Sequence, residues 1–167
     1  GEIPTAIVQR EMKKAKQITQ RFLDLFGENF YLEIQHHPKI PEQEIANKGL
    51  MELSRSMGIP LLATNDVHYI EKDDAEAQDA LLAIQTQKTV NDPDRLSMIE
   101  TPSFYLKSPE QMYKEFTDVK DALENTVKVA NECNVEISLG NKIYPNYELP
   151  KGETAASYLE KLTYERL

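Results

Sequence analysis

Apolar residues recur at helical spacing between residues 4 and 26, which predicts one long amphipathic helix. Pro4 suits the first turn of this helix, and Gly27 suits its end. Residues 29–35 follow, rich in aromatic and β-prone side chains, and their pattern predicts a strand. The next loop begins with His36 and contains two prolines.

A second helix is predicted over residues 42–57, with Gly58 as its C-terminal cap. The apolar residues that we expect it to turn toward the core are Ile45, Leu50 and Leu53. Residues 59–64 form a short apolar run of the kind found in buried parallel strands. The order helix, strand, helix, strand therefore predicts an α/β fold with a parallel sheet.

The alternation stops after residue 70. We expect further helices at 73–85, from Ser108 and Pro109 onward, from 118 or 120 to 133, and from 155 to 167. Less regular segments are expected at 86–103, 135–139 (a short extended piece, like 104–107) and 140–153 (a linker). The last helix has no stop signal, so we expect it to continue beyond the chain.

Composition narrows the class of protein. The 167 residues suffice for one domain with a core, and no run of eighteen apolar residues predicts a membrane span. A net charge of -9 makes this segment by itself a poor candidate for gripping DNA, because phosphate-binding surfaces are usually basic. The single cysteine, Cys133, is expected to be a small core residue, and a chain without an internal disulfide suits the cytoplasm.

Candidate metal ligands follow the two predicted strands. Asp66 and His68 come just after residues 59–64, at the strand end where α/β proteins gather ligand-binding residues. A carboxylate and an imidazole two residues apart can ligate Zn²⁺, Mn²⁺ or Fe, whereas a catalytic zinc site needs three protein ligands. His37 follows the other strand and is a further candidate. The alternatives are an exposed aspartate beside a hydrogen-bonded histidine, and a solvated histidine loop.

Four separated blocks resemble the alpha subunits of bacterial DNA polymerase III, the C-family replicative polymerases. They are NFYLEIQHH (29–37), PLLATNDVHYIEKDDAEAQDALLAIQT (60–86), FYLKSPEQMYKEF (104–116) and ENTVKVANECNVEISLG (124–140). Their order is that of the family, and the resemblance covers essentially the whole chain. Two departures are Gln78, where the family often has histidine, and His36, where arginine is common.

The resemblance implies the late strands and helices of a distorted (β/α)7 PHP (polymerase and histidinol phosphatase) barrel, followed by a mostly helical connecting segment. On this basis residues 1–100 are the C-terminal part of the PHP domain and 101–140 its end. Residues 141–167 are the linker and the start of the polymerase body. Asp66 and His68 match two family metal ligands, so a divalent metal (Zn, Mn or Mg) is implied for the intact parent, with an incomplete site here.

The resemblance further implies a DNA-directed DNA polymerase, cytoplasmic, whose PHP region has a structural or 3′-to-5′ exonuclease role. The parent would bind DNA, deoxynucleotides, a proofreading subunit and the sliding clamp, whereas this acidic piece would bind little DNA directly. We expect no catalytic residue within the chain and no polymerase activity from it alone. The alternatives are a non-catalytic scaffold that docks subunits and a metal-dependent phosphoesterase of the PHP superfamily.

Overall fold

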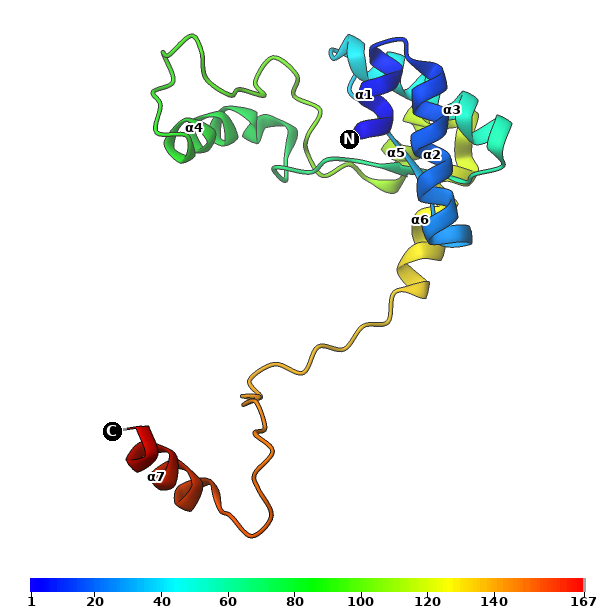
Figure 1. Ribbon diagram of the computed structural model, residues 1–167. Helices are drawn as coiled ribbons and strands as arrows, with labels where there is room; N and C mark the ends of the chain where they lie inside the picture. Colours follow the sequence, from blue (N-terminus) through cyan, green and yellow to red (C-terminus); the bar gives the residue numbers. More distant parts are fainter. Residues whose placement is uncertain (167) are drawn as a thin grey trace. The chain divides into compact units, whose positions relative to one another are not determined.

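The computed structural model describes residues 1–166, which divide into two compact units between Cys133 and Asn134. The first unit is α/β: helices pack on a sheet of two parallel strands (Figure 1). The second unit contains one helix and an irregular segment. No helix in the described part of the chain is long and apolar enough to cross a membrane.

The long helix predicted at 4–26 is in fact two helices, α1 (Glu2–Val8) and α2 (Met12–Phe26). The chain turns at Arg10, whose φ of 63° lies in the left-handed region. The Arg10 amide donates to Ile7 O, and the next amide donates to Ala6 O at 2.8 Å, which is the Schellman way of ending a helix. The sequence hides this turn because arginine occupies the position that usually holds glycine. Packing of α1 against α2 and α3 requires the reversal.

Strand β1 (Leu32–Gln35) and strand β2 (Leu61–Thr64) run parallel, connected by helix α3 (Pro41–Met57). Leu32 is paired with Leu61 and Ile34 with Ala63, and these four side chains are buried on the helix-covered face. Helix α3 ends at Gly58 in the left-handed conformation, as predicted. Its Leu50 and Leu53 are buried, but the prediction for Ile45 is wrong, because that side chain lies on the first turns of α3 and is 48% exposed.

Helix α3 approaches α1 closely at Gly49. A Cβ atom at this position would collide with Ile7 Cγ2 and lie 3.1 Å from the Ile7 Cδ1 and Cγ1 atoms. Glycine therefore sets the distance between the two helices, which lie side by side in Figure 1. The core continues beneath them through buried Ala15 and Leu50.

Helix α5 (Pro109–Glu115) begins as predicted, with Ser108 as N-cap and a reciprocal capping box to Gln111. A short 3-10 turn, η3 (Thr117–Val119), leads into α6 (Lys120–Glu132), which packs on β2. Asn125 Nδ2 fixes this packing by donating to Leu61 O at 2.8 Å. The prediction that Cys133 is a core residue is wrong, because α6 ends one residue earlier and the thiol is exposed.

Residues 70–103 form an excursion whose ends meet in a parallel bridge between Tyr69 and Tyr105. It contains the 3-10 turn η2 (Lys72–Asp74), helix α4 (Ala75–Gln85) and the irregular segment predicted at 86–103. The strand predicted at 104–107 is reduced to this bridge, which is the only strand pairing that the structure describes between residues 65 and 107.

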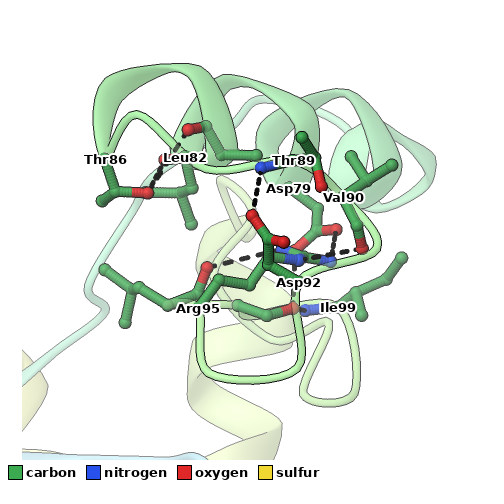
Figure 2. A network of polar contacts seen from close by, with 11 residues as sticks. Asp79, Leu82, Thr86, Thr89, Val90, Asp92, Arg95 and Ile99 are labelled. Carbon is green, nitrogen blue, oxygen red and sulfur yellow. Dashed lines mark hydrogen bonds and ion pairs between the residues drawn. The ribbon is translucent and has the colours of Figure 1, made fainter.

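A polar network around the buried carboxylate of Asp79 holds the segment after α4 (Figure 2). Asp79 accepts two hydrogen bonds from the Arg95 guanidinium, at 2.7 and 2.6 Å, and one from Ser97 Oγ at 2.5 Å. Arg95 Nε also donates to Val90 O at 3.1 Å. These bonds keep the pKa of the Asp79 carboxyl below its usual range. The segment is irregular in backbone but fixed by specific contacts.

The second unit has neither helix nor strand from 134 to 153, and then α7 (Ala155–Arg166). Thr154 and Ser157 cap this helix reciprocally, each accepting the other's amide at 2.9–3.1 Å. Tyr147 stacks on Tyr158 of α7, with ring centroids 5.9 Å apart.

Candidate functional site

The candidate residues lie where β1 and β2 end. Because the strands are parallel, His36 and His37 leave β1 on the same edge of the sheet from which Asp66 leaves β2. The bridge between Tyr69 and Tyr105 brings Phe104 to this edge. There the His68 amide donates a hydrogen bond to the Phe104 carbonyl oxygen at 2.8 Å. The structure therefore brings the predicted site residues to one place.

Asp66 and His68 lie close together in a turn that follows β2, not on the strand itself. β2 has ended at Thr64, and Val67 N donates to Asn65 O at 3.0 Å in a tight turn. His68 Nδ1 lies 3.8 Å from Asp66 Oδ1 and 2.9 Å from Asp66 O. The side chains are 49% (Asp66) and 30% (His68) exposed, so both can reach a ligand from solvent.

His37 is buried, unlike the solvated loop residue that was the alternative. Its Nδ1 lies 2.8 Å from Ser103 Oγ, and its ring stacks on Phe104 with centroids 4.3 Å apart. The His68 ring meets the same phenylalanine edge-on at 5.4 Å. Burial, and next the charge of Lys107, lower the pKa of His37. The lowered pKa favours the neutral imidazole, which is the form that binds metals.

One nitrogen of this buried ring has no hydrogen-bond partner among the described residues. His37 Nε2 is enclosed by protein and makes no bond there. Buried polar atoms usually have partners, so this unmatched ring nitrogen, in a ring that stacks on the same phenylalanine that His68 contacts, is an unusual feature of the site.

A buried ion pair lies next to the histidines. Lys107 Nζ donates to Glu115 Oε2 at 2.6 Å, and the lysine side chain is only 2% exposed. His36 Nδ1 lies 3.1 Å from the same carboxylate oxygen, in a geometry that makes no hydrogen bond. An open cavity of about 440 Å³ adjoins this pair and is lined in part by His36, Tyr105 and Glu115. The Lys107 ammonium lies 5.8 Å from the centre of the Tyr105 ring.

Sequence reasoning missed Lys107, Glu115 and Ser103 as neighbours of the site. Lys107 lies in the block FYLKSPEQMYKEF, but nothing in its local pattern predicts a buried lysine. Its burial depends on the pairing between residues 69 and 105, which joins segments far apart in the chain.

The donor set fits part of a metal site. Within residues 1–166 no three His, Cys, Asp or Glu side chains are placed to hold a metal ion. Asp66 and His68 provide one carboxylate and one imidazole, and a catalytic site of the zinc type needs at least three ligands. The arrangement can therefore contribute ligands to a cation whose remaining donors come from elsewhere.

Comparison with known proteins finds relatives along the whole chain. No family model matches it. DNA polymerase III subunit alpha of Borreliella burgdorferi is 43% identical over all of this chain and 15% of its own length. The subunit alpha of Thermus aquaticus is 38% identical over 98% of this chain and 14% of its own. An error-prone DNA polymerase of Symbiobacterium thermophilum is 29% identical over 99% of the chain. The chain thus spans about one seventh of the length of these relatives.

Proposed function

The chain belongs to the DNA polymerase III subunit alpha family, and we propose that it works as part of such a subunit in DNA-directed DNA synthesis during chromosome replication. The observation that carries this is 43% identity to one such subunit over the entire chain, repeated at 38% in a second. The parent would bind DNA and deoxynucleotides in the cytoplasm, with a proofreading subunit and the sliding clamp as partners. With a charge of -9, this segment would contribute little to DNA binding itself.

The first unit is proposed to be the late part of a PHP barrel. Support comes from two parallel strands joined by a helix, with polar side chains gathered at their carboxyl ends. The face of the sheet away from the helices carries a polar row, in which Thr64 Oγ1 bonds Glu33 Oε1 at 2.5 Å and accepts from Gln35 at 3.4 Å. A polar inner face of this kind suits a barrel that opens toward a metal site.

In this proposal Asp66 and His68 are two ligands of a divalent metal in the intact subunit, and His37 is a third candidate. The bound metal would activate water and stabilise a leaving oxygen if the region is an exonuclease, or tie the barrel together if its role is structural. The Asp66 carboxylate supplies negative charge. His68 Nδ1 donates to the Asp66 carbonyl oxygen, so the other ring nitrogen, Nε2, is the one that would bind the metal. Neither residue acts as a general acid or base.

A non-catalytic scaffold that docks other subunits is the second candidate. It is favoured by the net charge of -9, because an acidic segment suits contact with proteins better than contact with DNA. A free-standing PHP phosphoesterase is not favoured, because the similarity to polymerases continues through the second unit.

Metal analysis of the intact subunit tests these roles. The metal content of the wild type is compared with that of His68→Ala. His36→Ala is the matched control, because His36 lies on the same edge but its Nδ1 is 3.1 Å from Glu115 Oε2. We expect His68→Ala to lose metal and any exonuclease activity while primer extension persists, and His36→Ala to keep all three. Unchanged metal in folded His68→Ala would leave only the scaffold.

A further inference from the structure

Residues Val135 to Leu139 carry an alternating pattern that the first 166 residues leave without a strand partner. Val135, Ile137 and Leu139 are apolar, and Glu136 and Ser138 between them are polar. The apolar side chains are 82%, 74% and 86% exposed, and the segment has no ladder hydrogen bonds in the described part of the chain. Three exposed apolar side chains at alternate positions indicate a surface that is covered in the intact protein.

The spacing identifies the kind of cover. In a helix, positions i, i+2 and i+4 fall about 0°, 200° and 40° around the axis, so they would not share a face. In a strand with period two all three point to one side, and the polar pair points to the other. Valine and isoleucine also favour extended backbone. The run contains no proline, so every amide can donate to a ladder.

The ends of the segment also fit a strand. Gly140 follows with a φ of 83°, a conformation that would stop the ladder after Leu139. The five residues that remain match the usual length of a strand. Cys133 has left helix α6 with extended dihedral angles, φ -84° and ψ 98°, so the backbone enters the segment already extended.

We propose that residues 135–139 add as a strand to a sheet edge in the part of the alpha subunit outside this chain. The apolar side chains would face that sheet's core. We place the receiving sheet in the same polypeptide, because this chain covers only 15% of its Borreliella relative and most of such a subunit lies outside residues 1–167. Strand addition satisfies the backbone groups and the apolar face together. This inference rests on membership of the family and not on the metal site, so the two proposals fail separately.

Amide hydrogen exchange of the intact subunit, followed by mass spectrometry, tests the pairing directly. We expect amides of 135–139 to exchange on the order of a hundredfold more slowly than in the 167-residue chain. The protection should persist on dilution to a monomer that sedimentation verifies. Equal exchange in both proteins would overturn the proposal, and so would protection that appears only in dimers or on addition of another subunit.

A pair of variants separates strand addition from other structure. Ile137→Asp places a charge on the apolar face, and Ser138→Asp places the same charge on the adjacent polar face. In the intact subunit we expect Ile137→Asp to abolish the protection and Ser138→Asp to retain it. In the 167-residue chain both should melt at the wild-type temperature, because Ile137 is 74% exposed there. Equal effects of the two charges in the intact subunit would contradict an alternating strand.

Discussion

The ion pair between Lys107 and Glu115 gives a sharp test of how the site is held together. The two side chains share one hydrogen bond of 2.6 Å, yet their exposures differ, at 2% for the lysine and 22% for the glutamate. Removing one partner of a buried pair strands the other charge, and the cost depends on how much water the stranded charge can reach. The two single substitutions should therefore be unequal.

Glu115→Gln leaves an ammonium group that is almost completely enclosed, and we expect it to lower the free energy of unfolding by about 3 kcal/mol. Lys107→Met leaves a carboxylate that still reaches water and lies beside His36, and the methionine keeps the apolar stem. We expect a loss of about 1–2 kcal/mol. The double variant should lie within about 1 kcal/mol of the wild type, because no stranded charge remains.

Urea unfolding of the 167-residue chain, followed by circular dichroism, measures these differences. Lys114→Met is the matched control, because Lys114 lies on α5 next to Glu115 but is exposed. Its loss should change the free energy of unfolding by less than about 0.5 kcal/mol. If Lys107→Met proves as costly as Glu115→Gln, or if the double variant loses the sum of both, the argument from unequal burial is refuted.

Three further substitutions test other contacts. Gly49→Ala should lower the melting temperature, because overpacking against Ile7 (about 1–3 kcal/mol) outweighs a helix-propensity gain of about 1 kcal/mol. In an Ile7→Ala background the same substitution should raise the melting temperature, because the clashing side chain is gone. Asp79→Asn should speed proteolysis of the segment after α4 at neutral pH. Since Arg95 lowers the pKa of Asp79, the wild type should lose that protection only as pH falls below about 4, and equal cleavage of both proteins at pH 7 would contradict this. Ile34→Ala should lower the free energy of unfolding in urea by about 2–5 kcal/mol, because its side chain is fully buried, and a loss under 1 kcal/mol would be inconsistent with that core.

Local pattern was sufficient wherever an element depends on its own residues. Helix α3 with its glycine cap, the start of α5 at Ser108, and the parallel order of β1 and β2 all follow from periodicity and capping. The same reasoning placed Asp66 and His68 at a strand end, which the structure confirms as a location, while their role as ligands stays a prediction.

Features that join distant segments could not be read in this way. The turn at Arg10 has no glycine to mark it, and it exists because α1 must pack on both α2 and α3. Burial of His37 and Lys107 depends on residues 103–105 lying against the strand ends.

The sequence by itself determined the alternation of helices and strands up to residue 64 and the family, and it named Asp66, His68 and His37 as candidate metal ligands, which stays a prediction. The tertiary structure alone decided which of these residues meet. It brought His37, His68 and Phe104 together, and it enclosed the Lys107 ammonium beside Glu115. The physical reason is that periodicity reports the environment of one segment, whereas a site depends on contacts between segments dozens of residues apart.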